Sequence, residues 1–118
     1  MAFLVDTLPD DKVIRAVFSG TVTITGRFQA LQEIVALHEQ NKYKKLLLDF
    51  GSAEGVARSM EESEAYAAKL AAALPNHRMK IAYVGDVTQT AGIESLAALR
   101  GYFYQRFRTS DEALRWLK

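Results

Sequence analysis

The fold is decided by the stretch Lys44-Lys-Leu-Leu-Leu-Asp-Phe-Gly-Ser-Ala-Glu-Gly-Val-Ala-Arg-Ser-Met-Glu-Glu62, which runs from a strand through a loop to a helix start. Its leucine triplet, Leu46 to Leu48, predicts a strand covered on both faces, because a half-exposed strand would alternate apolar with polar residues. We therefore place this strand at the centre of a sheet. Gly51 and Gly55 punctuate the loop that follows. Partners of open α/β sheets meet the carboxyl ends of the strands, so this loop is the first place to look for function.

The residues before this stretch predict two strands and a helix. Strands are expected over 2–7 and 13–18, and the short turn between them should make the pair antiparallel. Thr23 or Thr25 can cap a helix that continues to about residue 41. The apolar side of this helix carries Phe28, Leu31, Ile34, Val35 and His38 at helical spacing.

Two strands and three helices are expected after the leucine strand. Ser59-Met-Glu-Glu62 and Thr109-Ser-Asp-Glu112 both have the form of a capping box and mark the starts of two of these helices. The expected ranges are 59–74, 89–100 and 109–117 for the helices, and 79–84 and 102–107 for the strands.

The resulting order, β-β-α-β-α-β-α-β-α, predicts one α/β domain over residues 1–118. Its mixed, mostly parallel central sheet should have about five strands packed with four helices, because helical crossovers make the later strands parallel. The chain has 118 residues, 49% hydrophobic and 25% charged, which suits a globular domain with one core.

Composition argues against several classes of function. The sequence has no cysteine, which removes disulfides, thiolate metal sites and cysteine nucleophiles. A net charge of +1 is too small to predict nucleic-acid binding by charge alone. The first residues lack a basic leader and no long apolar run follows, so we expect a cytoplasmic protein without membrane insertion.

A resemblance to a known family follows from these elements. With Leu46-Leu-Leu-Asp-Phe50 in the middle and Phe107-Arg-Thr-Ser-Asp-Glu-Ala-Leu-Arg-Trp-Leu117 at the end, nearly the whole chain resembles the SpoIIAA-like group of the STAS fold. STAS domains include bacterial anti-sigma factor antagonists and the cytoplasmic tails of sulfate transporters. The SpoIIAA-like group is largely uncharacterised and is also compared with the lipid-binding Sec14 domains. The resemblance implies a fold more than a function.

Ser59 is a candidate phosphoacceptor or helix cap. In the antagonists that the sequence resembles, a partner kinase phosphorylates a serine at the start of the helix after the central strand, in a pattern like Asp-Ser-Ser-Gly. The sequence here reads Ala57-Arg-Ser-Met60, without the aspartate, the paired serine or the glycine. Arg58 and the helix start would favour a phosphate, whereas Glu61 and Glu62 would repel it. We expect a structural cap worth about 1 kcal/mol.

No motif for catalysis, a metal or a cofactor stands out. Asp49 has no second carboxylate at a pairing distance in the sequence, so we expect it to satisfy loop amides. His38 and His77 lack the spacing of a metal motif. Gly-x-Gly-x-x-Gly, a Walker-type Gly-Lys-Ser/Thr and Gly-x-Ser-x-Gly are all absent. We therefore expect a protein that is not an enzyme and uses no cofactor.

The aromatic strand over 102–107 could form an interaction surface. Alternation places Phe103 and Phe107 on one face and Tyr102, Tyr104, Arg106 and Arg108 on the other. At a sheet edge, the tyrosine and arginine face would have the composition of an interface. The alternative is that the terminal helix folds back and covers that face.

Two classes of function stay open. The first is a non-catalytic interaction or regulatory module that forms a homodimer or meets a protein partner. Its candidate loop residues are Asp49, Gly51, Ser52, Gly55 and Arg58. The second is a binding protein for a small apolar or amphipathic, lipid-like ligand held between sheet and helices. Its candidate lining residues are Tyr66, Leu70, Leu96 and Trp116.

Overall fold

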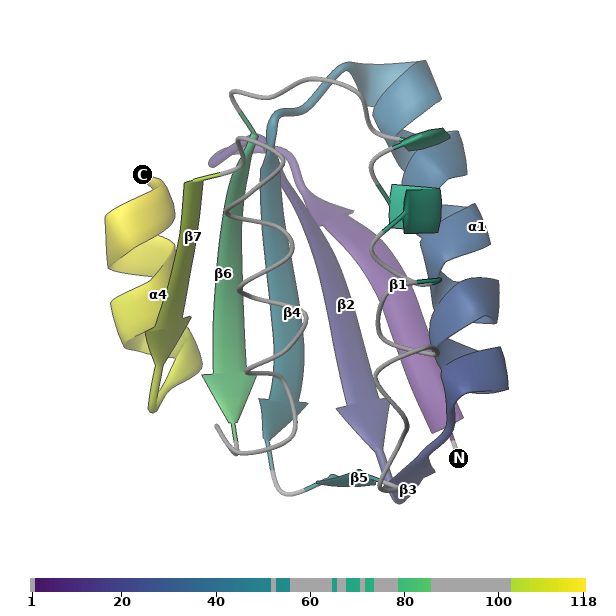
Figure 1. Ribbon diagram of the computed structural model, residues 1–118. Coiled ribbons are helices and arrows are strands. Elements are labelled where there is room, and N and C mark those ends of the chain that lie inside the picture. Colours follow the sequence, from purple (N-terminus) through teal and green to yellow (C-terminus); the bar gives the residue numbers. More distant parts are fainter. Residues whose placement is uncertain are drawn as a thin grey trace.

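The computed structural model describes residues 2–51, 53–55, 65, 68–70, 72–73, 79–85 and 103–118 (Figure 1). The strands are β1 (Ala2–Leu8), β2 (Val13–Ser19), β3 (Thr21–Val22), β4 (Lys45–Gly51), β5 (Glu54–Gly55), β6 (Lys80–Gly85) and β7 (Phe103–Phe107). The helices with described bounds are α1 (Ile24–Asn41) and α4 (Ser110–Leu117). None of the helices in these ranges is long and apolar enough to cross a membrane.

Of the four predicted helices, α1 and α4 are present with nearly the expected bounds. The described residues of the predicted helix over 59–74, namely 65, 68–70 and 72–73, are also helical. The predicted helix over 89–100 lies outside the described residues.

The main sheet has five strands in the order β1-β2-β4-β6-β7. Strand β1 pairs antiparallel with β2, and the other neighbours are parallel. The mixed, mostly parallel sheet is therefore confirmed, with the leucine strand β4 in the middle. Leu46 and Leu47 are fully buried and Leu48 is 2% exposed, because strands flank β4 on both sides and a core lies on each face.

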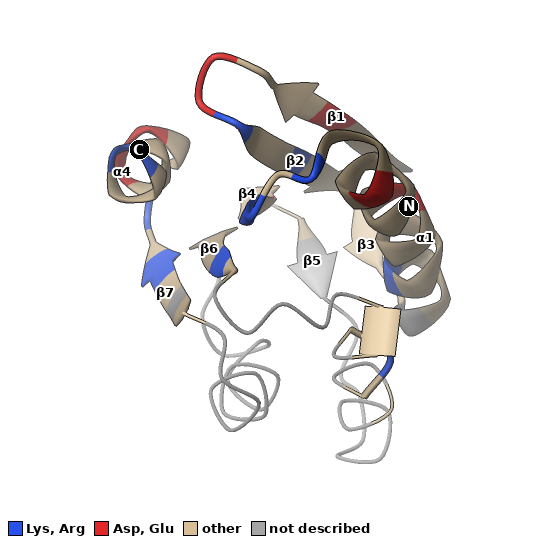
Figure 2. Ribbon diagram, turned by 90° about the horizontal axis from the view of Figure 1, so that it is seen from above, with Lys and Arg blue, Asp and Glu red and all other residues tan. Residues whose placement is uncertain are grey.

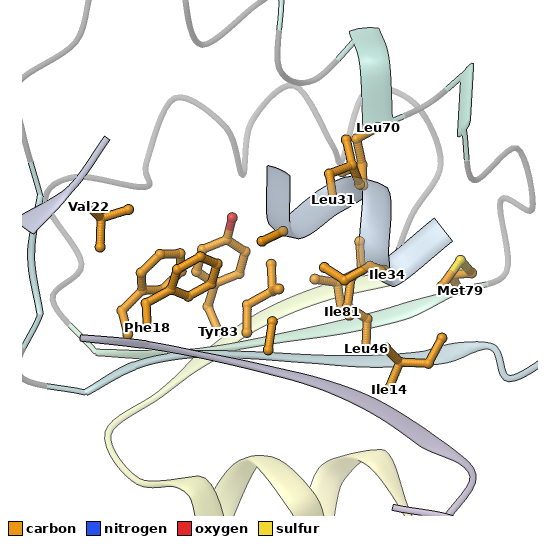
Figure 3. Close-up of a cluster of buried hydrophobic side chains, with 14 residues drawn as sticks. Ile14, Phe18, Val22, Leu31, Ile34, Leu46, Leu70, Met79, Ile81 and Tyr83 are labelled. Carbon is orange, nitrogen blue, oxygen red and sulfur yellow. The ribbon is translucent and has the colours of Figure 1, made fainter. Parts of the chain in front are cut away.

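One face of the sheet packs against α1. Leu46, Leu48 and Phe50 point to this face, where they meet Leu31 and Ile34 of the helix in the larger core cluster (Figure 3). Thr23 caps α1, since its hydroxyl oxygen accepts a 3.1 Å hydrogen bond from the Gly26 amide. Of the two caps considered, Thr23 is the one used.

The opposite face packs against α4. Leu47 points to this side, where Ala113 and Leu117 of the helix complete the smaller core cluster. Thr109 caps α4 by accepting a 3.2 Å hydrogen bond from the Glu112 amide, as the capping-box pattern predicts. Successive side chains of β4 point to opposite faces of the sheet, and the leucines therefore contribute to two cores, one on each side.

The aromatic strand β7 lies at the edge of the sheet, as considered above. The terminal helix folds back onto its phenylalanine face, where the Phe107 and Trp116 rings are 5.6 Å apart. Helix α4 therefore covers the phenylalanine face of β7. The alternative, in which the terminal helix covers the tyrosine and arginine face, is wrong. Phe103, at the start of the strand, remains 56% exposed.

Candidate functional site

The carboxyl ends of β2, β4 and β6 lie together, and the loop after β4 crosses this end of the sheet (Figure 1). The Ala53 amide donates a 2.7 Å hydrogen bond to the Phe50 carbonyl and so turns the chain directly after β4. Strand β5 then pairs in parallel with β3, with Thr21 opposite Glu54 and Val22 opposite Gly55. We name the residues 21–22, 51 and 53–55 the carboxyl edge. This pairing fixes the start of the loop against the residues that precede α1.

Two glycines allow the strands to end side by side at the carboxyl edge. Gly51 has φ 45° and Gly85 has φ 125°, and the register between β4 and β6 shifts between Asp49 and Gly51. A β-carbon on Gly85 would lie 3.1 Å from the Phe50 β-carbon and 3.2 Å from the Gly51 nitrogen. The close approach of these backbones therefore requires glycine at position 85.

An aromatic stack with a buried arginine lies beneath the carboxyl edge. Phe18, Phe50 and Tyr83 come from three adjacent strands, and their successive ring centroids are 4.6 and 5.3 Å apart. Figure 3 shows the Phe18 and Tyr83 side chains on the α1 side of the sheet, close to Val22 of β3. Val22 of the carboxyl edge and the apolar side of α1 belong to the same core cluster as these three rings.

Arg27 of α1 is fully buried over this stack. Its guanidinium carbon lies 5.1 Å from the Phe50 ring centroid and 5.8 Å from that of Tyr83, within the range of cation–π attraction. Its Nη2 donates a 2.5 Å hydrogen bond to the Tyr83 hydroxyl. A positive charge is therefore held inside the domain, next to the start of α1.

The sequence interpretation did not single out Arg27, although a signal for it exists. Arg27 precedes Ala30 and Leu31 by three and four residues, and it precedes Ile34 by seven. These spacings place its side chain on the apolar stripe of α1. A charged residue on such a stripe indicates a buried cation with specific neighbours.

Asp49 forms its hydrogen bond with the terminal helix and not with the loop that it was expected to serve. Because Leu48 and Phe50 face α1, the intervening Asp49 faces α4. Its carboxylate accepts a 2.7 Å hydrogen bond from the Ser110 hydroxyl in the first turn of α4. The expectation that Asp49 satisfies loop amides is therefore corrected: it joins the central strand to the terminal helix.

A salt bridge lies on the same face of the sheet. Arg15 of β2 donates from Nε and Nη2 to the two carboxylate oxygens of Asp6 on β1, at 2.9 and 2.6 Å. This two-point hydrogen bond raises the pKa of Arg15, burial opposes the increase, and the charge of Asp49 adds to it. Leu4, which neighbours Asp6 on this face of β1, is 59% exposed. Part of this sheet face beyond α4 is thus open.

The structure describes Asp49, Gly51 and Gly55 of the predicted interaction loop, whereas Ser52, Arg58 and Ser59 lie outside the described residues. Gly51 and Gly55 both belong to the carboxyl edge, where Gly51 pairs with Gly85 and Gly55 with Val22, and Asp49 lies on the α4 side. Within the described ranges, no group of three or more histidine or acidic side chains could hold a metal ion.

The predicted ligand-lining residues do not share one cavity. Leu70 is 3% exposed and belongs to the core on the α1 side, near Leu31 (Figure 3). Trp116 packs on the α4 side, so the sheet separates the two. Tyr66 and Leu96 lie outside the described residues. An open hollow of about 250 Å³ does occur beside α1, lined by Phe28, Leu31, Gln32, Val35, Lys69 and Ala73.

Comparison with known proteins shows the fold. The anti-sigma factor antagonist SpoIIAA, in its unphosphorylated form, matches 98% of this chain over 97% of its own, with a TM-score of 0.68 and 10% identity. An uncharacterized DUF3478-family protein with a SpoIIAA-like fold from Shewanella loihica PV-4 matches with a TM-score of 0.60 and 17% identity. That match covers 99% of this chain and 93% of the other. No family model and no curated protein matches the sequence. The chain therefore has the SpoIIAA-like STAS fold that the sequence resembles.

Proposed function

We propose that the protein is a non-catalytic interaction module whose contact surface is the carboxyl edge and the loop that leaves it. The observation that carries this proposal is the pairing of β5 with β3, which ties the start of the loop to the start of α1. A loop held by a scaffold at a sheet end is well placed to meet a partner. The likeness to an anti-sigma factor antagonist, a protein that acts on another protein, supports the same role.

The contacts of Asp49 support a role without catalysis. Its carboxylate is occupied by the Ser110 hydroxyl on the α4 side and so serves as a structural acceptor. We further propose that the module acts in the cytoplasm, with a second copy or another protein as its partner and with no cofactor or nucleic acid.

The proposal is tested by adding a charge at the carboxyl edge. Thr21 is exposed on β3, whereas Gln40 is exposed near the other end of α1, so Thr21→Arg and Gln40→Arg add the same charge at opposite ends. Light scattering measures self-association, and affinity capture measures recovery of a protein partner. We expect Thr21→Arg to abolish the association and Gln40→Arg to preserve it. A monomer that captures nothing, or two variants that behave alike, would contradict the proposal.

A second candidate function is the binding of a small amphipathic ligand, which the hollow beside α1 favours. The hollow is lined mainly by apolar side chains, and the Lys69 ammonium lies 5.2 Å from the Phe28 ring centroid at the same place. An apolar chain could lie along the helix while an acidic head group meets Lys69.

Native mass spectrometry set against the denatured mass tests this second candidate. Val35 lines the hollow, whereas its neighbour Ala36 is exposed on α1, so Val35→Trp fills the hollow and Ala36→Trp is the matched control. A bound mass should be lost from Val35→Trp alone. A purified protein with no mass beyond its polypeptide removes the candidate.

A further inference from the structure

A cluster of lysines surrounds a hollow at the amino-terminal end of the parallel strands, opposite the carboxyl edge. Lys12 ends the turn between β1 and β2, and Lys42 to Lys45 lead from α1 into β4. The hollow has a volume of about 310 Å³, and its lining residues, here named the lysine hollow, are Lys12, Asn41, Lys42, Tyr43, Lys44 and Lys45. Figure 2 looks onto this end, where the blue segments of the turn and of the start of β4 converge.

The backbone at two of these lysines is better suited to glycine. Lys12 has φ 58° and Lys42 has φ 60°, and they are the two non-glycine residues with positive φ in the described part of the chain. This left-handed conformation disfavours residues with a β-carbon and is usually taken by glycine or asparagine. Both exceptions line the same hollow.

Local structure gives a reason for a lysine at position 42 but not at position 12. Lys42 caps the carboxyl end of α1, where its amide donates a 2.7 Å hydrogen bond to the His38 carbonyl and the helix dipole favours a cation. Lys12 stands in a hairpin turn, where its amide donates to the Pro9 carbonyl at 3.2 Å and any residue with an amide would serve. The charge of Lys12 has no such local reason.

The lysines of the hollow form no ion pair with a described residue, although Asp10 and Asp11 lie in the same turn as Lys12. Lys45 reaches the backbone carbonyl of Asp11 at 3.4 Å. Like charges held together in this way favour an anion that several of them can share.

We propose that the lysine hollow binds a compact anion with several phosphate charges. Ammonium groups bind phosphate as point charges, and the hollow has the size of a small-molecule site. The acidic pair Asp10 and Asp11 lies in the same turn as Lys12, shown in red beside it in Figure 2. The Asp10 and Asp11 carboxylates would repel an extended anionic surface, such as an acidic membrane or a nucleic-acid backbone, that approached this end of the domain. A compact anion can enter the hollow without contacting them.

Isothermal titration with inorganic tripolyphosphate tests this site, together with thermal unfolding of the same samples. The Lys12→Gly, Lys42→Gly double variant should bind tripolyphosphate at least roughly tenfold more weakly than the wild type, because two cations are lost. Its melting temperature should equal or exceed that of the wild type, since glycine suits both backbone positions. Binding and stability should thus change in opposite directions, which a merely damaged fold would not produce.

The matched control is the Arg108→Gln, Arg115→Gln double variant, which removes two exposed positive charges that lie outside the lysine hollow. It should bind tripolyphosphate within about twofold of the wild type if the site is local. An equal loss of binding in this control would overturn the proposal in favour of general charge attraction. Absence of tripolyphosphate binding by the wild type at about 50 mM salt would also overturn it. So would binding of phosphatidylserine vesicles or RNA through these lysines without binding of tripolyphosphate.

Discussion

The Ser110 hydroxyl donates a 2.7 Å hydrogen bond to the Asp49 carboxylate, which joins the first turn of α4 to the central strand β4. The two residues are 61 positions apart in the sequence. Hydrogen bonds to a carboxylate are stronger than those between neutral groups, and this one is partly buried. It therefore fixes where the terminal helix lies on the sheet, next to the end of the strand that leads to the carboxyl edge.

Removal of either partner in this hydrogen bond should destabilise the fold. We expect Ser110→Ala and Asp49→Ala each to lower the free energy of unfolding by about 1–2 kcal/mol. The double variant should lose less than the sum, with a coupling of at least about 0.5 kcal/mol, because both single variants remove the same bond. Urea unfolding measures all three. Strictly additive losses would show that the bond contributes nothing.

The Tyr83 hydroxyl should stabilise the buried Arg27 guanidinium. Tyr83→Phe removes the acceptor of the Arg27 Nη2 hydrogen bond while keeping the ring in the aromatic stack. Since the donor is charged and buried, the free energy of unfolding should fall by about 1.5–3 kcal/mol. In an Arg27→Met background, Tyr83→Phe should cost much less. The same loss in both backgrounds would contradict a role for this bond.

Two glycine substitutions should differ in cost. Gly85→Ala would place a β-carbon 3.1 Å from the Phe50 β-carbon at φ 125°, whereas Gly51→Ala would meet Asp49 Oδ1 at 3.5 Å and φ 45°. We expect losses of unfolding free energy of about 2–3 kcal/mol for Gly85→Ala and about 1 kcal/mol for Gly51→Ala. Chemical unfolding of both variants gives the comparison. A Gly85→Ala variant as stable as the wild type would show that the backbones do not meet so closely.

Substitution of Ser59 separates its two candidate roles. If the hydroxyl acts as a helix cap, Ser59→Ala should lower the free energy of unfolding by about 1 kcal/mol and leave partner capture unchanged. Unfolding measurements and affinity capture on the same variant distinguish the two cases. Unchanged stability with abolished capture would instead assign Ser59 to a phosphorylation-dependent switch.

The sheet and its centre could be predicted from the sequence because strong local signals agreed there. The triplet Leu46 to Leu48 predicted a strand covered on both faces, and it lies in the middle of the sheet with both faces buried. Thr23 was one of two threonines expected to cap α1, and the capping box at Thr109 predicted the start of α4; the hydroxyls of Thr23 and Thr109 both accept amide hydrogen bonds there. These features depend on residues close together in the chain.

The contacts that shape the candidate site join residues far apart in the chain, and local patterns indicate such contacts only weakly. The pairing of β3 with β5 joins two-residue strands that are too short to show a periodic pattern. Asp49 could not be assigned to Ser110 without the position of α4 on the sheet. The prediction that Leu70 and Trp116 line one ligand site rests on the Sec14-like comparison and the supply of aromatic residues. Which face of the sheet each side chain occupies follows from the packing.

The central claim, that the carboxyl edge and its loop meet a protein partner, is tested most directly by site-specific photocrosslinking. A benzoylphenylalanine residue is placed at Ser52 in the loop, and the control places it at Gln40, near the far end of α1. We predict one defined crosslinked protein, a second copy of the chain or another protein, from position 52 and none from position 40. The absence of an adduct at position 52, or the same adduct from both positions, would contradict the account.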